Sequence, residues 1–250
     1  MEGELAYLLI GLAAFTAGAV NALAGGGTLI TFPVLTAVGL SAVTANVTNA
    51  VALCPGYFGG TFAQRKDLQG QGARLKLLLP LGVAGGLLGA WLLLLSGEKL
   101  FRALVPWLIL LASLLLALQD PIKAFVARGR KAGDHAKAAA LPLTLGAVYG
   151  GYFGAGLGVV MLATLGLTLD DNLTRLNALK QALSFVINVA AALFFLGSGQ
   201  VHWPTAGVMA VCALAGGVVG GKLARVIPPA RLRKVVVAIG ISVGLFYLSR

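Results

Sequence analysis

Long apolar runs recur along this chain, with short polar connections between them. Seven runs approach the roughly 20 residues that a helix needs to cross the hydrocarbon core of a bilayer. They are residues 5–23, 77–95, 101–118, 141–161, 182–196, 205–219 and 235–248. None alternates with the period of two that is typical of a half-buried strand. The pattern therefore predicts a bundle of membrane-spanning helices, because helices satisfy their own backbone groups inside lipid.

Composition agrees with a membrane bundle. Of the 250 residues, 58% are hydrophobic and only 11% are charged, and the mean hydropathy is +0.92. A soluble globule of this size would need far more polar surface. The net charge of +11 does not form one basic domain, because the lysines and arginines lie in the connections between apolar runs. Charge therefore predicts topology here, and we expect no nucleic-acid partner.

A glycine-rich motif near the start of the chain returns in its second half. The motif AGGGT at residues 24–28 reappears as AGLGV at residues 155–159, which is 131 positions later. At the same spacing the stretch 85–89 matches the stretch 216–220. One matching pair would be coincidence, but several at one spacing indicate an internal duplication of the kind that is frequent in secondary transporters.

The distribution of positive charge predicts how the two copies are oriented. Lysine and arginine crowd residues 65–76, 123–137 and 222–234, which the positive-inside rule places in the cytoplasm. Residues 96–100 and 197–204 carry almost no positive charge and are expected outside. Under the 131-residue offset the basic connection at 65–76 matches the uncharged one at 197–204. Equivalent loops then lie on opposite faces, so the duplication is predicted to be inverted.

Counting the crossings requires each glycine-broken segment to return to the side from which it started. Residues 5–40 and 138–169 are therefore predicted to be helical hairpins or helix pairs, with the glycine turn between the arms. The second arm of the first hairpin, residues 28–40, has only about 13 residues. It is predicted to be a half-helix that does not cross the full core of roughly 30 Å.

These expectations combine into one fold class. We expect an all-α integral membrane protein of two inverted repeats, each a glycine-broken helical hairpin followed by three transmembrane helices. Residues 1–119 form the first repeat, residues 120–137 a basic cytoplasmic linker, and residues 138–250 the second repeat. The first apolar run is expected to be a retained helix, because Glu2 and Glu4 stand where a signal peptide would be basic.

The duplicated glycine turns are the first candidate site. Consecutive glycines let the backbone leave helical geometry and expose N–H groups at the start of the next helix, where the helix dipole favours an anion. No Gly-Lys-Ser/Thr follows, which argues against a nucleotide-binding loop. The alternative is that the glycines only allow close helix packing, which we favour for residues 82–89 and 216–221. The candidates at the turns are Gly25, Gly26, Gly27, Thr28, Gly156 and Gly158.

A polar stripe beside Lys180 is the second candidate site. Asn177, Gln181 and Ser184 follow helical spacing and share one face, with Lys180 at its edge. Such a face is expected to line a cavity, where the lysine would pair with an anion; the alternative is that Lys180 extends to the cytoplasmic interface. Four further polar residues complete the predicted pocket, although each alone is often a packing hydrogen bond: Asn21, Asn46, Asn49 and Tyr152.

The acidic residues are informative by their position. All eight lie near the termini or in the connections. The predicted membrane core therefore contains no carboxylate, which disfavours transport of cations or metals and a carboxylate proton relay. No nucleophile with a base and no aspartate pair falls within the apolar runs. We accordingly expect no catalytic residue, no metal site, no cofactor and no enzymatic activity.

One segment resembles a known family. Residues 17–35, with the sequence AGAVNALAGGGTLITFPVL, followed by residues 42–49, resemble the first-half signature of the TauE/SafE sulfite exporter family. The second half resembles a degenerate copy, in which Leu157 replaces the middle glycine and Thr164 stands in place of Pro33. The resemblance implies a multi-pass transporter of the prokaryotic inner membrane, which usually exports small anions such as sulfite or organosulfonates.

We therefore predict a secondary carrier that exports sulfite or an organosulfonate by alternating access. The anion would bind between the glycine turns and the polar faces of residues 44–49 and 177–188. A carrier of another small anion, such as a carboxylate, and an importer are the alternatives within transport. A non-transporting scaffold or assembly subunit is the alternative from another class. The predicted partners are the small anion and the lipid bilayer, and a homo-oligomer stays open.

Overall fold

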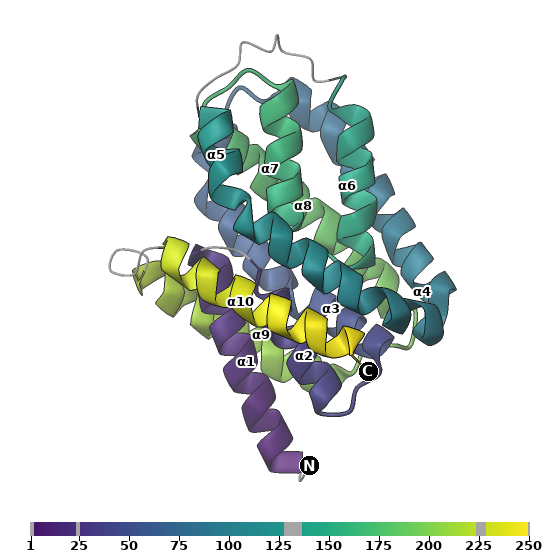
Figure 1. Cartoon of the computed structure of the whole chain (residues 1–250). Helices are drawn as coiled ribbons and strands as arrows, with labels where there is room; N and C mark the ends of the chain where they lie inside the picture. Colours follow the sequence, from purple (N-terminus) through teal and green to yellow (C-terminus); the bar gives the residue numbers. More distant parts are fainter. Residues whose placement is uncertain (1–2, 24–25, 128–136, 224–228, 250) are drawn as a thin grey trace.

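Helices form all the regular structure in the part of the chain that the computed structural model describes, namely residues 3–23, 26–127, 137–223 and 229–249. Figure 1 shows their arrangement. The prediction of an all-α protein is confirmed. In chain order the elements are α1 (Gly3–Leu23), α2 (Thr28–Ala37), α3 (Ala42–Ala63), the 3-10 helix η1 (Arg65–Leu68), α4 (Gly72–Ala117), α5 (Gln119–Ala127), α6 (Ala140–Tyr152), α7 (Leu157–Thr168), α8 (Leu173–Leu196), α9 (Trp203–Leu223) and α10 (Pro229–Leu248).

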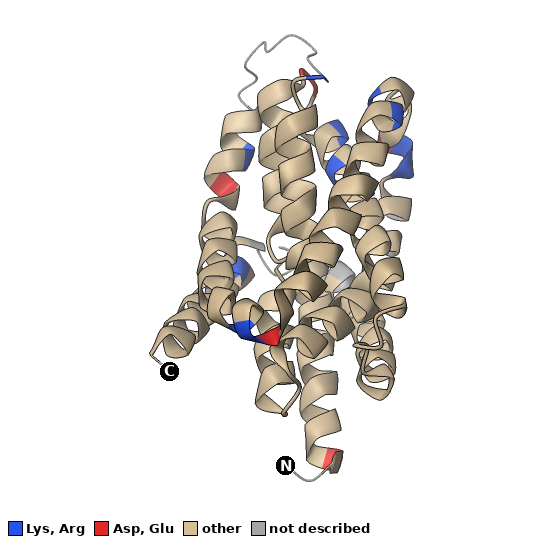
Figure 2. Ribbon diagram, turned by 90° about the vertical axis from the view of Figure 1, so that its right-hand side faces the viewer, with Lys and Arg blue, Asp and Glu red and all other residues tan. Residues whose placement is uncertain are grey.

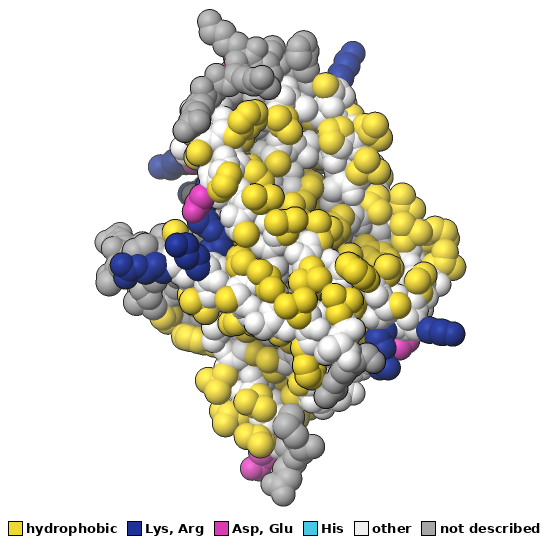
Figure 3. All heavy atoms as spheres, viewed as in Figure 1, with side chains coloured by type: hydrophobic (Ala, Val, Ile, Leu, Met, Phe, Trp, Pro, Cys, Tyr) yellow, Lys and Arg dark blue, Asp and Glu magenta, His cyan; other side chains and the backbone are white. Residues whose placement is uncertain are grey.

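The outer surface of the bundle is apolar. Among the described residues, four segments are long and apolar enough to cross a membrane: Gly3–Asn21 of α1, all of α4, all of α8 and Trp203–Gly220 of α9. Figure 3 shows one face covered by hydrophobic side chains, with the charged ones at its margins. Figure 2 shows long uncharged stretches of helix between a few charged places. A surface of this kind belongs in lipid, so the chain is a membrane protein.

α4 is two helices joined at a kink. Gly97 has a φ of +66°, a backbone conformation that glycine adopts without steric cost. The kink falls at the predicted boundary between the apolar runs 77–95 and 101–118. Next to it, the carboxylate of Glu98 accepts hydrogen bonds from the backbone N–H groups of Ala42 (2.8 Å) and Val43 (2.9 Å). The kink of α4 therefore anchors the first turn of α3.

Each predicted hairpin is a pair of helices separated by its glycine turn. α6 and α7 flank residues 153–156, so the apolar run 141–161 is not one spanning helix. α2 has 10 residues and α7 has 12. At about 1.5 Å per residue, each reaches only roughly half-way across the hydrocarbon core. In Figure 1 the α6–α7 pair stands at the top of the view and the α1–α2 pair at the bottom.

Glycines bring the hairpin of one half against a helix of the other half. α1 packs along α9, and α6 packs along α4. A Cβ on Gly89 of α4 would overlap the carbonyl oxygen of Val148 in α6, and a Cβ on Gly216 of α9 would overlap that of Phe15 in α1. Only glycine allows backbones to approach so closely. The packing role predicted for these two glycines is confirmed.

The helices of the two halves begin at matching positions. α3 and α8 begin 131 residues apart, as do α4 and α9. α10 begins at Pro229, which is 131 residues after Glu98 at the kink of α4. The order of helices in residues 28–117 thus recurs in residues 157–248.

An aromatic cluster, formed by Phe32, Phe101, Tyr152 and Phe153, fills the space where α2, α4 and the end of α6 meet. The ring centroids of Phe32 and Phe153 lie 5.6 Å apart, as do those of Phe101 and Tyr152, and both pairs meet edge to face. Phe32 and Phe101 are fully buried. The cluster packs α2 of the first half against the glycine turn of the second.

Candidate functional site

The first glycine turn places the start of α2 at Thr28, where the sequence predicted that this arm begins. Gly26 has a φ of +91°, which suits glycine. The backbone N–H of Gly27 donates a hydrogen bond of 2.7 Å to Asn21 Oδ1 at the end of α1. Among the described residues, no side chain caps the first turn of α2. Asn21 therefore fixes the turn from the preceding helix and leaves the start of α2 without a side-chain cap.

The second glycine turn is built in a similar way. Gly154 and Gly156 have φ values of +77° and +75°. The hydroxyl of Tyr149 donates a hydrogen bond of 2.5 Å to the carbonyl oxygen of Ala155. Gly156 then precedes the first residue of α7, and no side chain in the described part of the chain caps this helix. Two short helices thus begin at glycine turns with their positive dipole ends uncapped by side chains.

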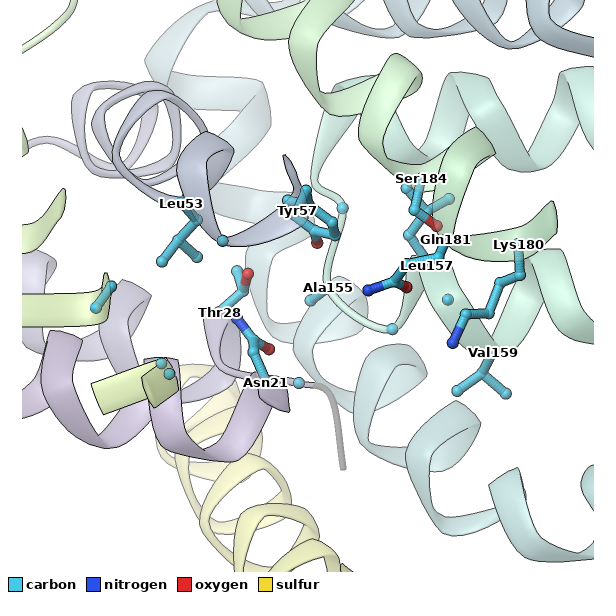
Figure 4. Close-up of a pocket in the computed structure, with 18 of the residues that line it drawn as sticks. Asn21, Thr28, Leu53, Tyr57, Ala155, Leu157, Val159, Lys180, Gln181 and Ser184 are labelled. Atoms are coloured by element: carbon cyan, nitrogen blue, oxygen red, sulfur yellow. The ribbon is translucent and has the colours of Figure 1, made fainter. Parts of the chain in front are cut away.

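Both turns face one cavity of about 590 Å³. Figure 4 shows Asn21 and Thr28 on one side of it and Gln181 and Lys180 on the other. A cavity of this size suits a small molecule. The predicted site residues that line it are Asn21, Gly26, Thr28, Gly156, Gly158, Asn177, Lys180, Gln181 and Ser184.

Lys180 lies beside the first turn of α7. Its Cδ, Cε and Nζ atoms are 3.7 to 3.9 Å from the point that a Cβ on Gly158 would occupy. A Cβ at position 158 would be in ordinary van der Waals contact with the lysine, so the side chain of Lys180 lies directly against this turn. Among the ion pairs of the described residues, none involves Lys180. Its ammonium group and the dipole of α7 therefore place positive charge at the same part of the cavity.

Ser184, one turn along α8 from Lys180, carries a buried hydroxyl that has no hydrogen-bond partner among the described residues. The side chain is 1% exposed and lines the cavity. Leaving a buried hydroxyl unpaired costs free energy, of the order of 1–3 kcal/mol. A ligand that accepts this hydroxyl would remove the cost.

Four predicted residues are not brought to the cavity wall. Asn46 Nδ2 donates to the carbonyl oxygen of Tyr152 (2.9 Å), and Asn49 accepts a hydrogen bond of 2.6 Å from Thr31 Oγ1. These bonds hold α3 to α6 and α2, which is the packing alternative that the sequence left open. Gly27 is held by Asn21, and Tyr152 belongs to the aromatic cluster. A fifth predicted residue, Gly25, lies outside the described residues.

Three polar residues line the cavity although the sequence did not point to them as site residues. Gln64, Gln119 and Lys123 line the cavity, and all three stand at or beside basic connections. The sequence placed Lys123 in the linker 120–137 and Gln119 directly before it. In the structure both lie on the short helix α5, one turn apart. Their spacing of four, which puts both side chains on one face of a helix, was the available signal.

The charged side chains in the described lining of the cavity are all positive. Among the described residues that form the cavity wall, only Lys180 and Lys123 are charged, and none is a carboxylate. His, Cys, Asp and Glu in the described residues form no group of three that could hold a metal ion. Lysines, amides, a free hydroxyl and two helix N-termini favour an anionic ligand.

An ion cluster lies at the connection between α7 and α8. Asp171 pairs with Arg74 of α4 at 2.6 Å and with Arg175 of α8 at 3.0 Å. Burial alone would raise the pKa of Asp171, but hydrogen bonds from Arg175 and Arg74 and from the backbone of Asn172 hold it below its ordinary value. The cluster ties the two halves together at the basic face.

Comparison with known proteins places the chain among membrane transporters. The family described as sulfite exporter TauE/SafE matches residues 10–247. The probable membrane transporter protein YfcA of Escherichia coli K12 is 29% identical over 226 residues, which cover 86% of this chain and 81% of the relative. The probable membrane transporter protein ORF9 of a Sinorhizobium species is 27% identical over 256 residues, covering 98% and 92%. No solved structure matches the chain significantly.

Proposed function

Because the chain belongs to the sulfite exporter TauE/SafE family, we propose that it is a secondary transporter that exports sulfite or an organosulfonate across the prokaryotic inner membrane. The main support for this proposal is the set of residues that line the cavity. The two glycine turns and Lys180 line the same cavity, and its described lining has no carboxylate. Such a lining attracts a small anion and repels cations.

The anion is held at the first turn of α7 in this proposal. Lys180 supplies the charge, and the neighbouring hydroxyl of Ser184 supplies a donor that has no other partner in the described chain. Gln181 adds an amide on the same helix face. Hydrogen bonds that involve a charged group are worth about 1.5–3 kcal/mol each, so Lys180 is the largest single contributor expected.

Alternating access requires two halves that can move against each other, and we propose that residues 1–119 and 138–250 are inverted repeats joined by the linker 120–137. The matching starts of α3 and α8 and of α4 and α9 support the duplication. The positions of the two hairpins at opposite ends of Figure 1 support the inversion.

The cavity is proposed to be open toward the cytoplasm in this structure. Gln64 and Lys123 lie at or beside basic connections and line the cavity. Toward the weakly charged face, the aromatic cluster and the bond between Glu98 and the start of α3 are proposed as the closed gate. Export would then load the anion at the basic face and release it after the aromatic cluster separates.

Ligand-dependent thermal unfolding of the purified protein tests this function. Sulfite or sulfoacetate should raise the unfolding temperature, because a ligand that binds only the folded state stabilises it. Acetate at the same ionic strength is the control for a carboxylate carrier. A scaffold should show no shift with any of these anions. A shift with acetate alone would favour the carboxylate carrier over the proposed substrate class.

A further inference from the structure

A second lysine lines the cavity from the linker side. Lys123 and Gln119 are four residues apart on α5 and share one face of this helix. Both line the cavity, together with Lys180 of α8. The cavity thus brings together one cation from the second repeat and one from the linker.

The neighbouring charges do not neutralise these lysines. Of the described residues, Arg233 and Asp120 also act on Lys123, and they form an ion pair with each other. Arg233 also donates a hydrogen bond of 2.8 Å to Gln119 Oε1. None of the ion pairs among the described residues involves Lys123 or Lys180. The described cavity wall therefore carries two positive charges and no carboxylate, and Asp120, which acts on Lys123, is already paired with Arg233.

Two like charges at a partly buried site raise the free energy of the unliganded protein. Burial and the Arg233 guanidinium lower the pKa of Lys123, while Asp120 opposes this change. A ligand with two negative charges would offset both ammonium groups, whereas a ligand with one would leave the second uncompensated. The buried hydroxyl of Ser184 offers a further donor to the same ligand.

We propose that Lys123 is a second substrate-binding residue and that the cavity selects doubly charged anions over singly charged anions of the same shape. The inference rests on the proposed function and refines it. Of the two forms in which sulfite occurs near neutral pH, the dianion is the one that this site takes. Lys180 holds the anion at the start of α7, and Lys123 supplies the discrimination by charge.

Sulfate and methanesulfonate form a matched pair of probes, because they have similar tetrahedral shapes and differ by one charge. Their affinities are measured by isothermal titration calorimetry on the full-length protein in detergent, at constant ionic strength. Lys123→Gln should weaken sulfate binding about tenfold, the loss expected for one charge-assisted contact, and change methanesulfonate binding less than about twofold. Lys123→Arg keeps the charge and should retain the preference for sulfate. Lys137→Gln removes an exposed lysine of the same linker and should change neither affinity.

The outcomes separate this inference from the proposed function. Preference for sulfate in the wild type that is lost in Lys123→Gln supports the inference. Equal binding of the two probes by the wild type overturns it, even when sulfite itself binds and the proposed function stands. An equal loss for both probes in Lys123→Gln also overturns it, because Lys123 would then act through general attraction alone. Failure of sulfite and both probes to bind refutes the proposed function together with the inference.

Discussion

The contact between α4 and α6 predicts a large penalty for a very small substitution. A Cβ at position 89 would overlap the carbonyl oxygen of Val148 and crowd the backbone nitrogen of Tyr152. Backbone atoms cannot move aside as a side-chain end can, so Gly89→Ala must push the two helices apart. Overpacking of this kind costs about 1–3 kcal/mol.

The same substitution has an opposing effect on the helix itself. Alanine is favoured over glycine in a helix interior by roughly 0.8–1.0 kcal/mol. Gly207→Ala on α9 isolates this gain, since a Cβ there would meet nothing within 4 Å. We therefore expect Gly89→Ala to lose up to about 2 kcal/mol of folding free energy and Gly207→Ala to lose none.

Thermal unfolding in detergent, followed by circular dichroism at 222 nm, measures the difference between the two variants. Gly89→Ala should unfold at a lower temperature than the wild type, and Gly207→Ala at the same temperature or a higher one. Equal unfolding temperatures for the two variants would contradict the close approach of α4 and α6 and the explanation of the glycine pattern built on it.

Ser184, Asp171 and the loops around residues 69 and 200 can each be tested separately. Ser184→Ala should weaken sulfite binding roughly three- to tenfold, the value of about one hydrogen bond, without lowering the stability of the unliganded protein; a titration of both proteins with sulfite measures it, and unchanged affinity would remove Ser184 from the site. The lowered pKa of Asp171 contributes stability that is present above its ordinary value of 3.8 and is lost as the pH falls through the folded value. Unfolding temperatures recorded at decreasing pH should therefore fall less steeply below pH 3.8 for Asp171→Asn than for the wild type. Parallel curves would contradict the pairing of Asp171 with Arg74 and Arg175. In a cysteine-free background, Gln200→Cys should react with an impermeant maleimide in intact cells and Gln69→Cys only after permeabilisation; labelling of both from outside would refute the inverted topology.

Some elements could be predicted because backbone chemistry determines them locally. Three glycines in a row favour a break in a membrane helix, so the start of α2 at Thr28 could be predicted from residues 25–27, whereas the glycine pairs 85–86 and 216–217 stay inside α4 and α9. The boundary between the halves of α4 followed from the polar residues around Gly97. The polar stripe on α8 could be assigned to a cavity because amides and hydroxyls are unfavourable on a helix face that contacts lipid.

Other features of the site depend on which helices pack together, and the residue pattern within one helix does not indicate its neighbours. Asn46 and Asn49 have the same donors as the residues that line the cavity, but their neighbours in space are Tyr152, Thr28 and Thr31. Lys123 belongs to a basic connection whose composition predicts exposure, and only the packing of α5 beside α7 brings it to the cavity. Pairing of α1 with α9 is likewise invisible in either segment alone.

Transport of sulfite by Lys180→Gln tests whether the anion binds between the glycine turns and Lys180. The protein is reconstituted into liposomes, and sulfite flux is compared with that of the wild type and of Lys76→Gln, which removes an exposed lysine that does not line the cavity. Loss of one charge-assisted contact predicts a flux at least about tenfold lower at subsaturating sulfite for Lys180→Gln, and an unchanged flux for Lys76→Gln. Equal flux in all three proteins would contradict binding of the anion between the glycine turns and Lys180.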